Sequence, residues 1–464
     1  MKTVHHTSKE PHKITQTQER RRRIISFLMP VIYLFCIGWV SPLYATQVSA
    51  ELPLMRAMGM GGNWGGNIDG IKNVPDSYIQ YLLKDNVNWI NIKVPIFNET
   101  ITDPTVKIRY RPATDKTYVT MYSFNDNDLI NAIMKFKQNG IKVYMSLILH
   151  LPSHDPFLNC GTADYGVDPH VMGDPELPNA QNSGSWGYAC IDPSLWWWDP
   201  NHPKHASNVA AFGASYTKVA VKYAKMAQQL GVEIFSIGEE MDRLFITRPS
   251  KRFPNHFRKQ LSKMVAAVRN NYKGLVTYGQ QSFVYLDHPE WWGLDKKSSS
   301  SLFMDLGLDV VSIHGYYSLT NTPVNRVYSV FELAKLWHKI FKDYLVPLKV
   351  RNPGIPIMFG DTSAVDAVDI LNSSLSHQGD PFIFSDLDGN GIDDGREQQA
   401  NMFHALLNVN KSYNYLLRGI FFQWCTIDTN PYIWDYNQNH RLIEIHGKPA
   451  ERVIRAVYRK WKQL

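Results

Sequence analysis

The sequence has few of the features on which nucleotide-binding and nucleic-acid-binding proteins depend. No strand-like run is followed by a GxGxxG or Walker-type glycine loop, which argues against a bound nucleotide. Beyond residue 50 the chain has no stripe of Lys and Arg, so nucleic acid is not expected as a partner. There is no internal repeat, and the one low-complexity block, the serine run 298–301, is typical of a loop.

Cysteine is also scarce, with four residues in the whole chain. Cys36 lies in an N-terminal apolar run, and Cys425 lies in a strand-like apolar segment where a small buried side chain is expected. Cys160 and Cys190 flank a stretch rich in Gly, Asp and Pro that is typical of one long loop. In an oxidising compartment a disulfide between these two is expected, although nearness in sequence does not establish nearness in space.

One long apolar run is present, at residues 24–40, and four arginines, residues 20–23, precede it. Small residues that end at Ala45 or Ala50 follow, which predicts a signal peptide cleaved after Ala50 or, alternatively, a retained signal anchor. The protein is therefore expected to be secreted, periplasmic or part of the cell envelope, with membrane contact only through residues 1–50 if they are not cleaved. This segment holds seven Lys/Arg and two Asp/Glu, so the formal net charge falls from +7 to +2 without it.

From residue 53 onward, short apolar runs alternate with longer amphipathic stretches, which favours βαβ units around a parallel sheet. Helical patterns fall between the runs, for example at residues 126–138, 216–230 and 398–409. Eight expected strands lie at residues 55–60, 89–95, 142–150, 233–238, 275–278, 310–314, 356–359 and 419–424. Eight alternations predict a closed (β/α)8 TIM barrel with long βα loops, formed as one catalytic domain by residues 53–464, and an open doubly wound sheet is the competing arrangement.

Several segments, taken in order, resemble glycoside hydrolases of clan A, and family 113 in particular, with families 5 and 53 as more distant relatives. The segments are GGNWGGN at 61–67, FNDNDL at 124–129, GIKV at 140–143, SIGEEM at 236–241, LDVVSI at 308–313, HGY at 314–316 and GKPAE at 447–451. No single segment is specific, and the resemblance depends on their order and spacing. It implies a glycosidase that cleaves a β-linked glycan with two carboxylates, is expected to be monomeric and needs no cofactor for its chemistry.

The resemblance also implies roles for individual residues at the ends of strands, where barrel enzymes build their active sites. Glu240 is the expected general acid/base, and Asp361 is the expected nucleophile or base, one methylene shorter than the usual Glu. Glu239 stands where many relatives have an Asn that binds the substrate, and Lys93 stands where relatives often have an Arg. A solvated strand-end carboxylate is the alternative for Glu240, and a helix-capping or turn Asp is the alternative for Asp361.

The shorter Asp361 leaves the stereochemistry open, because retaining enzymes hold their two carboxyls about 5 to 5.5 Å apart and inverting ones about 6.5 to 9.5 Å. Neighbouring residues of a regular strand point to opposite sides, so only one of Glu239 and Glu240 is expected to face the barrel mouth. If both carboxyls reached the cleft, repulsion between them would raise the pKa of one, which suits a general acid.

Further substrate contacts are expected from His314 and Tyr316, which share a face at i, i+2 of the sixth strand, with a core pair as the alternative. His150 ends the third strand in the same layer. Trp424, near the end of the eighth strand, resembles the aromatic platform beneath a sugar, unless the register is shifted by one at Gln423. A tryptophan buried in the core is the alternative. Asn63, in the segment after the first strand, completes the expected substrate-binding set.

Residues 386–397 (DLDGNGIDDGRE) fit the twelve-residue calcium-loop pattern, and this is the most specific local motif in the chain. The expected ligands are Asp386, Asp388, Asn390, Ile392 through its carbonyl, Asp394 and Glu397. The alternative is a polar turn, because no clear helix precedes the loop. A calcium ion there, between the seventh and eighth strands, would brace the catalytic face and take no part in the chemistry.

The sequence therefore predicts an endo-acting β-glycanase, and β-mannanase is the first candidate. The alternative from another class is a degenerate barrel that binds carbohydrate without cleaving it, since Asp361 and Glu239 depart from the family pattern. An envelope structural protein held by its N-terminal segment is a weaker third possibility.

Overall fold

The computed structural model describes residues 52–60, 71–98, 103–112, 122–150, 203–239, 241, 256–281, 306–320, 324–364, 366–371, 386, 389–425 and 445–464. All of them belong to one compact unit, Glu51–Leu464. The expected signal segment 1–50 and the expected disulfide partners Cys160 and Cys190 lie outside the described residues. Among the helices that the structure describes, none is long and apolar enough to cross a membrane.

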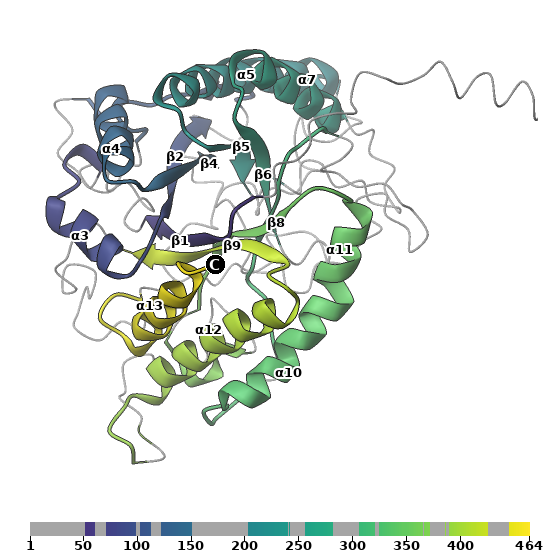
Figure 1. The fold of residues 1–464 in the computed structure, drawn as a ribbon. Helices are drawn as coiled ribbons and strands as arrows, with labels where there is room; N and C mark the ends of the chain where they lie inside the picture. Colours follow the sequence, from purple (N-terminus) through teal and green to yellow (C-terminus); the bar gives the residue numbers. More distant parts are fainter. Residues whose placement is uncertain are drawn as a thin grey trace, which may run out of the picture. The chain divides into compact units, whose positions relative to one another are not determined.

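Eight parallel strands form a closed barrel (Figure 1). They are β1 (Met55–Met60), β2 (Trp89–Asn98), β4 (Lys142–His150), β5 (Ile234–Glu239), β6 (Leu275–Gln281), β7 (Val311–His314), β8 (Ile357–Thr362) and β9 (Leu417–Cys425). Neighbouring strands pair in chain order, and β1 pairs with both β2 and β9, which closes the ring. The short strand β3 (Val106–Lys107) adds antiparallel pairing to the end of β2. The prediction of a (β/α)8 barrel is confirmed.

Helices cover the outside of the barrel between successive strands. They are α3 (Asp76–Lys84), α4 (Asp126–Gln138), α5 (His205–Leu230), α7 (His256–Asn271), α10 (Val330–Ile340), α11 (Val346–Arg351), α12 (Asp394–Ser412) and α13 (Pro449–Trp461), with a π-helical turn (Phe341–Leu345) between α10 and α11. In Figure 1, α5 and α7 pack together on one side, and α10, α12 and α13 pack along another.

The alternation of side chains along the strands divides the core into two layers. A smaller cluster, the lower interior cluster, fills the barrel interior toward the amino ends of the strands. It includes Met55, Trp89, Tyr144, Met358 and Phe421. A larger cluster lies between the strands and the surrounding helices. Apolar side chains thus fill the amino end of the barrel interior, and the buried charged side chains of the described residues in the strands lie further toward the carboxyl end.

Every expected strand has a counterpart in the structure, and the segments 55–60 and 142–150 match β1 and β4 at both ends. The helix expected at 126–138 is α4, which Asn125 caps by accepting a hydrogen bond from the backbone N–H of Asn127. Its buried side chains are Leu129, Ala132, Ile133 and Phe136, at the helical spacing that the sequence shows.

Candidate active site

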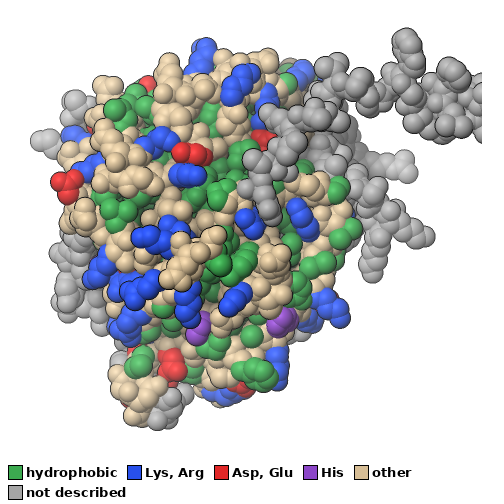
Figure 2. Space-filling view, in the orientation of Figure 1, with side chains coloured by type: hydrophobic (Ala, Val, Ile, Leu, Met, Phe, Trp, Pro, Cys, Tyr) green, Lys and Arg blue, Asp and Glu red, His purple; other side chains and the backbone are tan. Residues whose placement is uncertain are grey.

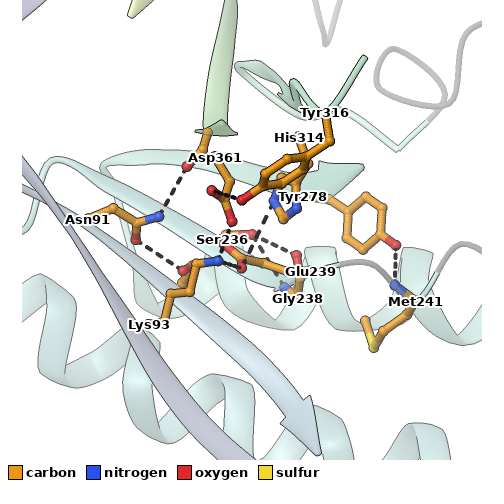
Figure 3. A network of polar contacts seen from close by, with 12 residues as sticks. Asn91, Lys93, Ser236, Gly238, Glu239, Met241, Tyr278, His314, Tyr316 and Asp361 are labelled. Atoms are coloured by element: carbon orange, nitrogen blue, oxygen red, sulfur yellow. Dashed lines mark hydrogen bonds and ion pairs between the residues drawn. The ribbon is translucent and has the colours of Figure 1, made fainter. Parts of the chain in front are cut away.

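A cluster of charged side chains lies at the carboxyl end of the barrel strands (Figure 3). Lys93 comes from β2, Glu239 is the last residue of β5, His314 is the last residue of β7, and Asp361 lies near the end of β8. All four are buried, with relative exposures of 3%, 0%, 1% and 1%. Active sites of (β/α)8 enzymes form at this end of the barrel.

Lys93 forms ion pairs with both carboxylates. Its Nζ lies 2.5 Å from Oδ2 of Asp361 and 3.4 Å from Oε2 of Glu239. The other oxygen of Asp361, Oδ1, accepts a hydrogen bond of 2.6 Å from the hydroxyl of Tyr316. The Nε2 of His314 lies 3.9 Å from Oε2 of Glu239. Four strands and the segment after β7 thus bring one amine, two carboxylates, an imidazole and a phenol together.

Regular alternation explains how Lys93 and His314 reach the interior. Trp89 belongs to the lower interior cluster, so Lys93, four residues further along β2, points to the same side. Val310 likewise belongs to that cluster, and His314 lies four residues after it.

The inward position of Glu239 depends on a β-bulge. Ile234 is in the interior cluster, so a regular strand would turn Gly238 and residue 240 inward and Glu239 outward. Between β5 and β6, however, Ser236 pairs with Thr277 and Glu239 pairs with Gly279. From the first pair to the second, β5 advances by three residues and β6 by two, so β5 carries one extra residue. This extra residue turns Glu239 toward Lys93, as bulges beside active sites commonly do.

Asp361 reaches the interior in the same way. Met358 is in the lower interior cluster, and Gly360 faces the interior beside Ser312, so a regular strand would turn Asp361 outward. Ile313 pairs with Phe359, and the next pair is His314 with Asp361. Between these pairs β7 advances by one residue and β8 by two, so the extra residue lies in β8. The two bulges explain why the expectation from regular alternation does not describe these strand ends.

Tyr316 is held against Asp361 by the backbone after β7. Strand β7 ends at His314, so Tyr316 lies beyond the strand on which it was expected. The N–H of Gly315 donates to the carbonyl of Asp361 at 2.6 Å, and the hydroxyl of Thr362 donates to the carbonyl of Gly315 at 2.9 Å. These bonds fix the segment that carries the phenol.

Burial raises the pKa of Asp361 above its usual range, and the negative charge of Glu239 adds to this effect. The positive charge of Lys93, its hydrogen bond and His314 act in the opposite direction without cancelling the effect of burial. Burial and the charge of Glu239 also raise the pKa of Tyr144 and of Tyr216, so both stay protonated phenols.

Other expected site residues lie wholly or partly outside the described residues. Glu240 and Asn63 are outside, so their roles stay predictions. His150 and Trp424 end or nearly end β4 and β9, but only their backbone is described. Gln423, which precedes Trp424, is buried next to Gly59.

A polar layer that was not predicted from the sequence lies beneath the cluster. Asn91 donates from Nδ2 to the carbonyl of Gly360 at 3.2 Å, and its Oδ1 accepts from the hydroxyl of Ser146 at 3.1 Å. The signal was present in β2, where Asn91 and Lys93 interrupt an apolar run at the inward spacing of two residues.

Part of the expected calcium loop is described. Both oxygens of Asp386 accept backbone N–H groups, from Asn390 and Gly391, each at 2.9 Å. The side-chain amide of Asn390 donates to Glu397 at 2.8 Å. Within the described part of the chain, no group of three or more His, Cys, Asp or Glu residues is arranged to hold a metal. Asp388 lies outside that part, while Ile392 is exposed and Asp394 is buried at the start of α12.

Residues 194–344 match the model of Glycoside Hydrolase Family 113. The chain resembles family 113. The match includes β5 to β7, with Glu239, His314 and Tyr316, but not Lys93 or Asp361. A comparison with curated proteins gives no match.

Solved structures of family 113 share the fold. A GH113 β-1,4-mannanase in a complex has a TM-score of 0.55 at 17% identity, over 88% of this chain and 99% of that one. The GH113 β-mannanase AaManA from Alicyclobacillus acidocaldarius, in complex with ManMIm, has a TM-score of 0.53 at 17% identity, over 88% of this chain and 98% of that one. At this identity the likeness shows a common fold, and the match to the family 113 model supports a glycoside hydrolase.

Proposed function

We propose that the protein hydrolyses β-linked polysaccharide or oligosaccharide, with endo-acting β-mannanase activity as the first candidate. The observation that carries the proposal is the position of Asp361, a carboxylate held by Lys93 and Tyr316 at the carboxyl end of the barrel. The match to family 113 over residues 194–344 supports the same reaction class.

In the proposed reaction Asp361 is the nucleophile and Glu240 is the general acid/base. Asp361 forms a bond to the anomeric carbon as the glycosidic bond breaks, and the leaving oxygen takes a proton from Glu240. Water, deprotonated by Glu240, then releases the sugar from Asp361. The retaining course follows from the resemblance, and in an inverting course Asp361 would accept the proton of the attacking water instead.

Lys93 and Tyr316 have complementary tasks in this scheme. Each binds a different oxygen of Asp361, so the plane of the carboxylate is fixed and ionisation is favoured in a buried site. The carboxyl still needs a pH above its raised pKa to act as a nucleophile. The acidic limb of the pH profile is therefore expected above the ordinary range of an aspartate, about 3.9.

The test is a reducing-sugar assay of the full chain against β-mannan, β-glucan, galactan and xylan. Asp361→Asn is expected to abolish turnover, while Asp343→Asn, which changes an exposed Asp of the π-helical turn, is expected to keep it. Glu240→Gln is expected to slow substrates with poor leaving groups by about 10² to 10⁴, and activated aryl glycosides less. Wild-type rates in Asp361→Asn would place the second carboxylate elsewhere.

A second candidate is a barrel that binds a glycan without cleaving it. Its support is the closed ion pair between Lys93 and Asp361, both buried, at 2.5 Å. Binding of a glycan by the wild-type chain without cleavage of any member of the panel would favour this candidate.

We also propose that residues 386–397 bind calcium and that the protein is exported from the cytoplasm. The loop pattern supports the first proposal, and the apolar run after four arginines supports the second. Mass spectrometry of native protein should find an N-terminus near Glu51 and a bridge between Cys160 and Cys190. An intact N-terminus in a membrane fraction would favour the signal anchor, and free thiols at both positions would contradict the bridge.

A further inference from the structure

Glu239 is a fully buried carboxylate that receives no hydrogen bond from the described residues. Its relative exposure is 0%, and neither of its oxygens has a hydrogen-bond partner there. The Nζ of Lys93 lies 3.4 Å from Oε2 of Glu239 and is closer to Oδ2 of Asp361, at 2.5 Å. Buried polar groups almost always have a partner, so a carboxylate without one calls for an explanation.

The charges around Glu239 are also unbalanced. Among the described residues, the two carboxylates of Glu239 and Asp361 share the amine of Lys93 as their lysine partner. A buried charge without a full partner is costly, and the carboxylate of Glu239 adds to the effect of burial in raising the pKa of Tyr144 and of Tyr216. His314, at 3.9 Å, is beyond the distance of a direct hydrogen bond to Glu239.

The backbone around Glu239 keeps this carboxylate inside the barrel. The bulge in β5 turns it inward, and its partner on β6 is Gly279. A Cβ at position 279 would lie 2.6 Å from Nε2 of His314 and 3.0 Å from Cγ of Glu239. A bulge on one strand and a glycine on the next thus make room for a side chain that gains no hydrogen bond from the described residues.

We propose that Glu239 binds a protonated amine of the substrate, so that the glycan contains hexosamine units with free amino groups. An ammonium supplies both the missing donors and the missing positive charge, whereas a hydroxyl would supply a donor alone. The inference rests on the proposed glycosidase function, because it places the amine in the sugar unit beside Asp361.

The experiment compares β-1,4-linked glucosamine oligosaccharides with their N-acetylated counterparts of equal length and with manno-oligosaccharides. Binding is measured by calorimetry on the full chain carrying Glu240→Gln, which leaves Glu239, Lys93 and Asp361 in place. The pH is kept near 6, about two units below the usual range of an α-amino group, so that the amines are protonated. Glucosamine oligosaccharides are expected to bind at least about tenfold more tightly than the N-acetylated ones.

Adding Glu239→Gln should remove this preference, so that glucosamine and N-acetylated oligosaccharides bind with equal affinity. Equal affinity for amine and N-acetylated ligands in Glu240→Gln would overturn the inference, as would an equal loss for all ligands in a Glu239→Gln chain that melts like its parent. If the Glu239→Gln chain does not fold, the inference is judged on the Glu240→Gln chain alone. A preference for glucosamine oligosaccharides there supports it, and equal affinity overturns it. Hydrolysis of neutral glycans without any preference for amines would leave the proposed function standing and remove only this inference.

Discussion

Lys93 is the residue on which the polar cluster depends, because it is the one amine within ion-pair distance of both carboxylates in the part of the chain that the structure describes. In the sequence, Lys93, Glu239 and Asp361 are three separate departures from the family pattern. In the structure they are one unit, in which an additional carboxylate and a shortened one share a single lysine.

Lys93→Met is expected to destabilise the fold by about 3 to 5 kcal/mol, since it leaves two buried carboxylates without their cation. Denaturant unfolding measures the loss, and Lys342→Met, at an exposed position of the π-helical turn, is the matched control. A free energy of unfolding equal to that of the control would mean that Lys93 contributes no net stabilisation to the pair.

Asp361→Asn is expected to make the protein more stable near neutral pH even as it abolishes turnover. The pKa of Asp361 is raised in the folded state, so the stability that this group contributes is fully present below the unfolded value, about 3.9. That contribution is lost as the pH rises through the folded pKa. Asn carries no charge at any pH and avoids this loss.

Thermal melts of wild type and Asp361→Asn from about pH 3 to pH 8 measure the effect. The difference between the two melting temperatures should increase as the pH rises and disappear below the ordinary pKa range of an aspartate. Asp343→Asn should have the melting temperature of wild type at every pH. A difference that does not change with pH would contradict the raised pKa.

At the scale of single elements, the strands were predictable and their bulges were not. Each strand is an apolar run bounded by polar residues, so composition alone located it. A bulge depends on the register between two strands, as for Glu239 against Gly279, and no local pattern encodes that register. The structure was therefore needed to show that the side chains of Glu239 and Asp361 face the barrel interior, although both residues were already predicted to belong to the site.

The helix α5 shows the same limit, because it begins at His205 and not near Tyr216 as expected. Gly213 in its first half is unfavourable for a helix in isolation. In the fold, a Cβ at position 213 would lie 2.7 Å from the side chain of Gln260, so the glycine allows α5 and α7 to pack closely. A tertiary contact thus outweighs the local preference.

Gly360→Ala is expected to destabilise β8 by about 1 to 3 kcal/mol, because its Cβ would overlap the hydroxyl oxygen of Ser312. Ser312→Ala removes that oxygen and leaves the Cβ of residue 312 at 3.5 Å, an ordinary contact. The double variant should therefore recover much of the loss, and a double-mutant cycle of unfolding free energies measures the coupling. Strictly additive losses would show that the overlap with Ser312 is not the cause.

At the scale of the whole molecule, the segment 386–397 lies in the chain between the last residues of the candidate site and the outer helices. It follows β8, which carries Asp361, and leads directly into α12, which packs against α10 and α13. Asp393 caps α12 by accepting the backbone N–H of Arg396 at 3.1 Å. A ligand that binds this segment would thus stabilise the start of α12 and the helix layer against which α12 packs.

Calcium is therefore expected to raise the melting temperature of the full chain. A ligand that binds only the native state adds RT ln(1 + [L]/Kd), about 2.7 kcal/mol at a hundredfold excess over Kd. EDTA should reverse the gain, and Glu397→Gln, which keeps the side-chain volume but removes the bidentate carboxylate, should abolish the calcium dependence. Asp386→Ala is a poorer test, because its carboxylate also binds the N–H groups of Asn390 and Gly391 and its loss would weaken the loop without any metal. A melting curve that neither calcium nor EDTA moves would leave residues 386–397 as a polar turn whose acidic pattern serves only to begin α12.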